Sequence, residues 1–502
     1  MPAPQPLSIL LTGIPEFDVI LRGGLPKHRL HLVEGSPGTG KTTIALRFLL
    51  EAVAKGERCL YITLSETVEE LTSTAAAHGW SLEGIDLFEL VPAEAELEHQ
   101  QTVLYPAEAE FGETMRQITQ RIEATRPERM VIDSLSELRL LAQDQLPYRR
   151  QLLTLKRFLQ GRRVTTLVLD DMTTGGDGDL HSLVHGVISL QQIERDYGAS
   201  RRRLRIAKMR GTNYQSGWHD FTLVTGEVLV FPSLIAEEHK THIEGAAVAS
   251  RVAGLDEVLG GGLDRGTTTM LVGPSGAGKS SMALHYAMAA VKQGEYAAYF
   301  SFDETFETLS RRADALGLPV AETVKAGKLG WKRANPSRLS PGEFVWQVRR
   351  EVEHKQARVV IIDSLNSYFG TMPEERSLVL QMHELLTYLG QKGVTTMLIL
   401  GQHGITGDVR SDVDISYLAD TVMQLRYFES RGEVRQAISV IKTRMARHER
   451  TIREFQINEH GVSVGDALRE FQGVLTGVPT FSGEGTQLMK RKSPPDAETA
   501  AS

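Results

Sequence analysis

The sequence predicts an α/β protein of two tandem domains, each a parallel β-sheet flanked by helices. A Gly-rich loop occurs twice, as GSPGTGKT at 35–42 and GPSGAGKS at 273–280. Each loop follows a short apolar run and opens a helical pattern, and this setting distinguishes a phosphate-binding loop from a chance match. Short β-branched runs alternate with longer helical patterns in both halves, which is typical of a parallel sheet covered on both faces, with ligands at the carboxyl ends of its strands.

The elements around the two loops are equivalent. We expect a strand at 30–33 and a helix at 44–52 in the first half, and a strand at 269–272 and a helix at 282–290 in the second. Further on, strands at 130–132 and 165–169 enclose a helix at 148–159. Lys41 and Lys279 are 238 residues apart, far more than the 20–50 residues of a solenoid repeat, so a whole domain is duplicated. Four pairs of segments align between the halves: 11–35 with 252–273, 60–71 with 298–309, 129–138 with 359–368, and 206–214 with 440–448.

These matches and the local composition predict the domain limits. The first domain spans 1–235, a polar linker spans 236–247, and the second domain spans 248–478. The remaining segment, 479–502, is rich in Gly, Ser, Pro and charge and lacks the apolar side chains needed to order itself, so we expect a flexible tail.

The two loops predict two nucleoside triphosphate sites. Their glycines turn successive backbone N–H groups toward phosphate oxygens at the positive end of a helix. Lys41 and Lys279 reach the β- and γ-phosphates, while the hydroxyls of Thr42 and Ser280 supply ligands for Mg²⁺. The predicted nucleotide-binding residues are Gly35, Ser36, Gly38, Thr39, Gly40, Lys41, Thr42 and Thr43 in the first half, and Gly273, Ser275, Gly276, Ala277, Gly278, Lys279, Ser280 and Ser281 in the second.

Carboxylates at strand ends complete the predicted chemistry, since phosphoryl transfer needs a second metal ligand and a group that orients or deprotonates the nucleophile. Asp133 and Asp363 each end an apolar strand and suit magnesium. Glu66 and Glu304 each lie 25 residues after their loop lysine and suit the base. The halves differ beside that base, because Ser65 precedes Glu66 whereas a second carboxylate, Asp303, precedes Glu304.

Two further groups of polar residues leave alternatives open. Polar residues at strand ends are candidates for sensing the γ-phosphate: Asp170 and Asp171 in the first half, and Gln402 and His403 in the second. Two pairs of cations, Lys208 with Arg210 and Lys442 with Arg444, have the i, i+2 spacing of one strand face. They line the crevice of their own domain, reach the γ-phosphate on a neighbouring subunit, or keep an edge strand soluble.

Composition limits the function classes. The net charge of −7 argues against a dedicated nucleic-acid binder. The arginine run at 201–205 has no interleaved aromatic residue, and we interpret it as a solvated hairpin. The single cysteine, Cys59, excludes an intramolecular disulfide and a cysteine-based zinc site. No signal peptide or apolar run long enough for a membrane span occurs, and we expect a cytoplasmic protein.

These residues resemble the KaiC family of tandem RecA/DnaB-like ATPases, over roughly 8–478. The resemblance rests on four signals in each half: the GG-L turn before the loop, the loop itself, the strand-end acids, and the K-x-R segment. It implies a double-ring homohexamer with ATP and Mg²⁺ between subunits, in which the first ring hydrolyses ATP slowly and the second autophosphorylates and dephosphorylates. It also implies that Asp303 and Glu304 activate the acceptor hydroxyl, and that the residues contributed across the interface are Lys208, Arg210, Thr212, Lys442 and Arg444.

Three departures from the family pattern limit what is transferred. Ser65 replaces the first glutamate of the acid pair in the first half, so hydrolysis there depends on Glu66. Asp303 is one methylene shorter than the family's glutamate, which sets a base back by ~1.5 Å, a misplacement able to slow a reaction. The family carries adjacent Ser and Thr acceptors, whereas this chain has Ser416 and Tyr417. Ser416 is therefore the expected acceptor, with Tyr417 and Ser411 as weaker candidates. The tail does not support a KaiA-like activator, and binding of a KaiB-like protein stays open.

The leading functional hypothesis is a hexameric ATPase with serine/threonine autokinase and autophosphatase activity in its second domain, serving as a timing or signalling hub. A DNA-dependent motor of the RecA/DnaB type is a second hypothesis, from the fold and the arginine run. A third is a nucleotide-gated scaffold in which hydrolysis is incidental.

Overall fold

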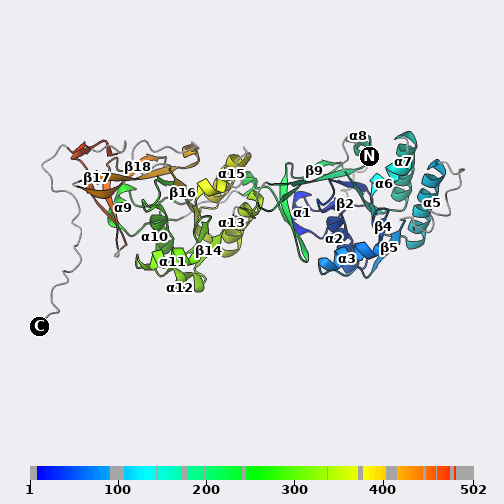
Figure 1. The fold of residues 1–502 in the computed structure, drawn as a ribbon, viewed down its shortest axis with the longest axis horizontal. Helices are drawn as coiled ribbons and strands as arrows, with labels where there is room; N and C mark the ends of the chain where they lie inside the picture. The colour runs from blue at the N-terminus through cyan, green and yellow to red at the C-terminus, as the bar shows by residue number, and fades with distance from the viewer. Residues whose placement is uncertain are drawn as a thin grey trace, which may run out of the picture. The chain divides into compact units, whose positions relative to one another are not determined.

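The computed structural model folds into two compact units, Met1–Ser233 and Leu234–Ser502, which we describe separately (Figure 1). No helix among the residues described is long and apolar enough to cross a membrane. The structure describes residues 8–90, 107–142, 145–171, 178–195, 198–239, 245–335, 337–370, 377–402, 415–430, 432–444, 448–458, 461–474 and 480–481.

The first unit is built on a nine-stranded sheet with the strand order β11-β10-β9-β8-β3-β7-β6-β4-β5. Neighbouring strands from β8 to β5 pair in parallel, and those from β8 to β11 pair antiparallel. The strands of this sheet are β3 (Leu30–Glu34), β4 (Cys59–Thr63), β5 (Ile85–Glu89), β6 (Arg129–Asp133), β7 (Thr165–Asp170), β8 (Gly186–Ile193), β9 (Arg201–Met209), β10 (His219–Val224) and β11 (Glu227–Phe231). Two short strands, β1 (Ile9–Leu10) and β2 (Leu25–Pro26), form a separate antiparallel pair.

Helices cover both faces of this sheet because buried strand residues alternate between its faces. Val33 and Tyr61 pack on one face with α1, α2 and α3, while Leu32 and Ile62 pack on the other with α5 to α8. In Figure 1 the first group lies at the blue end of the colour scale, and the second group runs from blue through cyan to green. The helices are α1 (Pro15–Ile20), α2 (Lys41–Ala54), α3 (Val68–Ala77), α5 (Ala107–Thr125), α6 (Leu135–Ala142), α7 (Gln145–Gly161) and α8 (Gly178–Leu183).

The second unit repeats this topology in a nine-stranded sheet of order β14-β13-β15-β16-β12-β17-β18-β19-β20. The strands from β14 to β17 pair in parallel, and those from β17 to β20 pair antiparallel. The predicted α/β class and the duplication are therefore confirmed. The strands are β12 (Thr268–Gly273), β13 (Tyr296–Ser301), β14 (Leu329–Arg333), β15 (Ala357–Asp363), β16 (Thr395–Gly401), β17 (Thr421–Ser430), β18 (Glu433–Thr443), β19 (Arg453–Asn458), β20 (Gly461–Ala467), β21 (Phe471–Gln472) and β22 (Thr480–Phe481).

The second sheet is also covered on both faces. One core joins it to α9–α12, and the other joins it to α13–α15 with two 3-10 helices. The helices are η1 (Ala236–His239), α9 (Ala253–Val258), α10 (Lys279–Lys292), α11 (Phe306–Asp314), α12 (Val320–Lys325), α13 (Pro341–Lys355), α14 (Leu365–Gly370), α15 (Ser377–Gln391) and η2 (Ser416–Leu418). Two segments outside the predicted domain limits have regular structure, since η1 buries Ala236 in this core and β22 pairs with β21.

The turn before each phosphate loop requires glycine. Gly24 and Gly262 have φ angles of 130° and 127°, in the region that residues with a Cβ rarely adopt. A Cβ on Gly24 would lie 2.1 Å from the carbonyl oxygen of Leu10, and one on Gly262 would lie 2.6 Å from that of Val248. The close backbone approach explains why the GG-L pattern occurs in both halves.

Candidate nucleotide-binding sites

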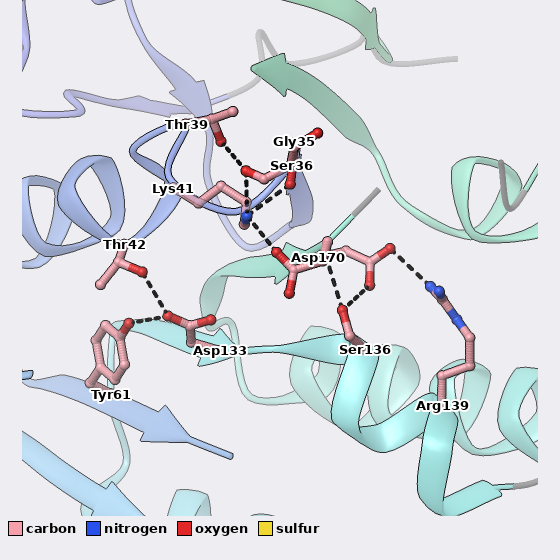
Figure 2. Close-up of polar contacts among 11 residues, drawn as sticks. Gly35, Ser36, Thr39, Lys41, Thr42, Tyr61, Asp133, Ser136, Arg139 and Asp170 are labelled. Carbon is pink, nitrogen blue, oxygen red and sulfur yellow. Dashed lines mark hydrogen bonds and ion pairs between the residues drawn. The ribbon is translucent and has the colours of Figure 1, made fainter. Parts of the chain in front are cut away.

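The first phosphate loop joins the buried strand β3 to α2, as predicted. Gly38 and Gly40 have positive φ angles of 81° and 101°, which orient the loop around the first turn of α2. The helix begins at Lys41, whose ammonium donates to the carbonyl oxygens of Gly35 at 2.8 Å and Ser36 at 3.2 Å (Figure 2). The loop thus holds a buried cation at the amino end of a helix, a geometry suited to an anionic phosphate.

Asp133, at the end of β6, faces the first residue after the loop lysine (Figure 2). Its Oδ2 accepts hydrogen bonds from the Thr42 hydroxyl at 3.1 Å and from the Tyr61 hydroxyl at 2.6 Å. Burial raises the pKa of Asp133, and the hydrogen bonds from Tyr61 and Thr42 oppose that rise. A hydroxyl and a carboxylate from separate elements therefore meet at one point, the oxygen ligands that Mg²⁺ prefers.

The carboxylates of the strand-end acids Asp170 and Asp171 have separate partners, although the Ser136 hydroxyl also accepts from the Asp171 backbone N–H at 3.0 Å. Asp170 accepts from the Ser136 hydroxyl at 3.1 Å and from the Arg139 guanidinium at 2.9 Å (Figure 2). Asp171 forms an ion pair with Lys41 at 2.6 Å. Asp170 contacts the phosphate loop only through its backbone, where its carbonyl oxygen accepts from the Gly35 N–H at 3.2 Å. The side chain of Asp171 binds the cation that a nucleotide would need.

Glu66 follows β4, and its carboxylate has no ion pair with any of the residues that the structure describes. Its backbone N–H is fixed by the Thr63 hydroxyl at 3.1 Å, which also donates to its carbonyl oxygen at 2.6 Å. Oε2 is buried and has no hydrogen-bond partner among the residues that the structure describes. Burial, followed by the nearby charges of Asp133 and Glu70, raises the pKa of Glu66. A carboxylate with a raised pKa and a vacant lone pair is suited to accept a proton.

The second phosphate loop repeats this arrangement. Lys279 donates to the carbonyl oxygens of Gly273 at 2.8 Å and Pro274 at 2.7 Å. Asp363, at the end of β15, accepts from the Tyr299 hydroxyl at 2.5 Å and from the Ser280 hydroxyl. Burial lowers the pKa of Lys279 to about 8. The loop opens into a cavity of about 830 Å³, whose lining includes Ser275, Gly276, Gly278, Lys279, Ser280, Ser281, Asp303, Glu304, Arg312, Asp363 and Gln402.

The two carboxylates of the second half lie on this cavity but have different partners. Asp303 accepts from the hydroxyls of Ser364 at 2.9 Å and Ser367 at 2.5 Å. Glu304 forms an ion pair with Arg312 of α11 at 2.6 Å. The pair at 303 and 304 therefore consists of one carboxylate bound by hydroxyls and one bound by a cation.

In each unit the two predicted cations lie near the amino ends of the parallel strands, whereas the phosphate loop lies at their carboxyl ends. In the first unit, the register aligns His31 of β3 with Gly186 of β8, and Gly186 with Met209 of β9. That level is four residues before Gly35, about 13 Å along a strand. The Lys208 ammonium donates to the carbonyl oxygens of His181 and Val184, and Arg210 donates to that of Ser182 at 3.0 Å.

This position excludes two of the three alternatives for the cations. They do not line the crevice of their own domain, and β9 and β18 are interior rather than edge strands. Thr212, which follows β9, has a buried hydroxyl without a hydrogen-bond partner among the described residues. The third alternative, a role toward another copy of the chain, stays a prediction.

The second unit places the expected phosphoacceptor beside its cations. Lys442 donates to the carbonyl oxygens of Ser416 at 3.0 Å and Ala419 at 2.9 Å, and Arg444 donates to that of Tyr417 at 3.1 Å. Ser416 is exposed, and the Tyr417 ring is 53% exposed. The register aligns Thr443 with Thr421 and Thr421 with Thr269, four residues before Gly273. The expected acceptor and the two cations therefore lie together at the amino ends of the parallel strands, away from the phosphate loop of their own unit. Two other predicted residues, His403 and Ser411, fall outside the described residues.

Comparisons with known proteins agree with this geometry. A sequence model of the family described as "ATPase: KaiC" matches residues 10–234 and again 248–469. The chain belongs to the KaiC ATPase family. Its two α/β units are accordingly RecA-like domains, as the resemblance predicted.

Three curated relatives align along nearly their whole length. The circadian clock protein KaiC3 of Synechocystis sp. is 27% identical over 489 residues, covering 95% of either chain. The circadian clock oscillator protein KaiC of Acaryochloris marina is 28% identical and covers 94% of this chain and 91% of its own. That of Synechococcus elongatus is 28% identical and covers 95% and 92%. The chain is thus a diverged KaiC homologue.

The arginine run of this KaiC-family chain differs in one respect from the prediction. No aromatic residue is interleaved in the run and we predicted a solvated hairpin, but Arg203 and Arg205 lie over the Trp218 ring, with guanidinium carbons 4.6 and 4.8 Å from its centroid. Trp218 is distant in sequence and comes alongside because β10 follows it and pairs with β9. Arg201 forms an ion pair with Asp220 at 2.6 Å. These partners occupy the run within the sheet, which favours the hairpin interpretation.

Sequence reasoning missed four contacts of the KaiC-type sites. Tyr61 and Tyr299 bind the strand-end aspartates, and both lie 20 residues after their loop lysine, a repeated offset that would have revealed them. The contacts of Asp171 with Lys41 and of Arg312 with Glu304 occur in one half only. No repeat marks them, and only the tertiary structure shows them.

Proposed function

We propose that this KaiC-family ATPase is a Mg²⁺-dependent ATPase and autokinase that works as a double-ring homohexamer. The first domain hydrolyses ATP, and the second transfers the γ-phosphate to Ser416 of a neighbouring copy and later removes it. The names of the relatives, circadian clock proteins, extend the proposal to a timing or signalling hub. A KaiB-like protein is the partner class that the family suggests.

The observation that carries the proposal is the separation of each phosphate loop from its cations. Loop and cations lie at opposite edges of one sheet in both units, and in the second unit Ser416 lies with the cations. A head-to-tail ring brings the cation edge of one copy against the loop edge of the next, because heterologous contacts that close form rings. Each nucleotide is then completed by the neighbour, whose cations stabilise charge that develops on the transferring phosphoryl group.

The residues at both loops fit a magnesium ion. Thr42 with Asp133, and Ser280 with Asp363, each bring a hydroxyl oxygen and a carboxylate oxygen into hydrogen-bond contact, and Mg²⁺ takes oxygen ligands. We assign these four residues to the ion, held directly or through water. When bound, the ion neutralises charge on the β- and γ-phosphates.

In the first domain we assign Glu66 as the base for hydrolysis. A water oxygen bonds to the γ-phosphorus, the bond from that phosphorus to the bridging oxygen breaks, and ADP leaves with the electron pair. The water proton passes to the free Oε2 of Glu66, whose raised pKa favours acceptance. Lys41 holds the phosphates once it leaves Asp171.

In the second domain the attacking oxygen is the Ser416 hydroxyl of the neighbour. It bonds to the γ-phosphorus, its proton passes to one carboxylate of the pair at Asp303 and Glu304, and ADP again leaves with the electron pair. Ser416 is favoured over Tyr417 because a tyrosine hydroxyl projects several ångströms farther than that of the threonine in the family. Lys442 and Arg444 bind the carbonyl oxygens of Ser416 and of the next residue, Tyr417, and so fix the position of the acceptor.

The test mixes two inactive variants of the full chain. Lys279→Ala removes nucleotide binding from the second loop, and Ser416→Ala removes the acceptor. Each alone is expected to stay unphosphorylated with ATP and Mg²⁺, whereas assemblies formed from both should carry phosphate on Ser416 of the Lys279→Ala chain. Phosphopeptide mass spectrometry with isotopically labelled Lys279→Ala chain identifies the acceptor copy. A mixture without phosphate, with wild-type chain phosphorylated in parallel, would contradict transfer between copies.

A further inference from the structure

Arg312 of α11 binds a catalytic candidate and the phosphate-loop helix at once. Its Nε and Nη2 atoms donate to Oε1 and Oε2 of Glu304 at 3.3 and 2.6 Å. Its Nη1 atom donates to the hydroxyl of Ser281, on the first turn of α10, at 3.0 Å. All three residues line the 830 Å³ cavity of the second unit. The arginine thus donates a charge-assisted hydrogen bond to each carboxylate oxygen of Glu304.

The first half lacks this arginine. Arg312 lies eight residues after Glu304, and the residue eight after Glu66 is Thr74, which is exposed on α3. Oε2 of Glu66 accordingly has no hydrogen-bond partner among the described residues. The two halves place a glutamate at the same position, yet a guanidinium binds only the one in the second half.

This difference changes what each glutamate can do. A carboxylate whose two oxygens both accept from a guanidinium has fewer free lone pairs for orienting water or accepting a proton. Asp303 has no cation among the contacts found for it and accepts only from the hydroxyls of Ser364 and Ser367. It therefore remains the carboxylate able to take a proton from an acceptor hydroxyl.

We infer that Arg312 is a positioning residue that withholds Glu304 from water and so suppresses ATP hydrolysis in the second domain in favour of transfer to a hydroxyl. The inference rests on the proposed function. In hydrolysis the water oxygen bonds to the γ-phosphorus as ADP leaves, and the proton needs a free carboxylate such as Glu66. In transfer the serine oxygen forms the same bond, and its proton passes to Asp303. The arginine selects between these two nucleophiles because it occupies Glu304, whereas the contacts found for Asp303 among the described residues are with hydroxyls alone.

The test uses the full chain with Glu66→Gln, which removes the base of the first domain. Adding Arg312→Thr, the residue found in the first half, is expected to raise kcat for ATP hydrolysis at least tenfold, since a freed general base contributes 10²–10⁴-fold. KM should change little. Arg312→Lys, which keeps the charge but not the two-pronged contact, should raise kcat less. Adding Glu304→Gln to Arg312→Thr should abolish the gain, an outcome that a merely structural role for Arg312 does not predict.

The reverse substitution keeps the inference testable if Arg312→Thr fails to fold. Thr74→Arg at an exposed position of the otherwise native chain should lower hydrolysis by the first domain about tenfold. A chain that binds ATP and phosphorylates Ser416 but gains no hydrolysis with Arg312→Thr overturns the inference alone, as does a gain that persists with Glu304→Gln. A chain that binds no ATP overturns the proposed function and this inference together.

Discussion

Nucleotide binding at the second loop should weaken as pH rises, because Lys279 is a buried cation without a carboxylate partner at hydrogen-bond distance among the described residues. Its contacts are the carbonyl oxygens of Gly273 and Pro274 at 2.8 and 2.7 Å, and burial lowers its pKa from 10.5 to about 8. The nucleotide-free protein therefore loses this proton near pH 8. Bound phosphates favour the charged lysine, so binding above that pH requires uptake of one proton.

The magnitude follows from the pKa of Lys279. If only the charged lysine binds phosphate, the dissociation constant increases by a factor of 1 + 10^(pH − pKa). With a pKa of about 8, that factor is about two at pH 8, about ten at pH 9 and about a hundred at pH 10. Each tenfold step corresponds to about 1.4 kcal/mol of binding free energy.

The assay is the fluorescence anisotropy of a labelled ATP analogue between pH 6.5 and 10, with circular dichroism to verify folding. The chain carries Lys41→Ala, so that only the second loop binds. The control adds Gly401→Asp, which supplies the carboxylate that Lys41 has in Asp171. A Cβ on Gly401 would lie 3.3 Å from Oδ1 of Asn366, so a small shift accommodates it. We expect this variant to retain its affinity to higher pH. A dissociation constant that stays within twofold between pH 7 and 9.5 would refute the reasoning.

Two further predictions concern the first unit. Asp171→Asn should tighten ATP binding about tenfold in a Lys279→Ala chain, because it releases Lys41 from a charge-assisted contact of about 1.5 kcal/mol; weaker binding in the same anisotropy assay would show that Asp171 helps to hold the nucleotide. Glu57→Ala should lower the free energy of unfolding of the first unit, measured in urea, by about 3 kcal/mol. The Arg129 guanidinium is 1% exposed and lies 2.5 Å from Glu57, so the substitution leaves a buried cation without its counter-charge. The exposed Glu83→Ala serves as control and should change stability by less than about 0.5 kcal/mol; equal losses in the two variants would contradict the argument.

The sequence by itself determined the fold class, the duplication and the phosphate loops. These features are local, because a glycine that permits a positive φ angle and a lysine at the start of a helix act within one strand–loop–helix segment. Asp133 and Asp363 belong to the same class, since an apolar run that ends in a carboxylate already marks the carboxyl edge of a parallel sheet. The second copy made each of these predictions stronger.

The sequence did not determine which residues pair across the sheet. The position of Lys208 at the edge remote from its own loop depends on the register of β9 against β8 and of β8 against β3, and no periodicity encodes that register between distant strands. The stacking of Arg203 on Trp218 likewise requires β10 to return beside β9.

The tertiary structure alone decided how the two halves differ. Lys41 is paired with Asp171 in one half, and Glu304 is paired with Arg312 in the other, so the same two positions meet different charges. The paired residues are 130 and 8 residues apart in the sequence, and the direction of a charged side chain outside a motif is set only when the element that carries it packs. The packing of the helices and strands directs these charged side chains, and it therefore makes the sites at two similar loops chemically different.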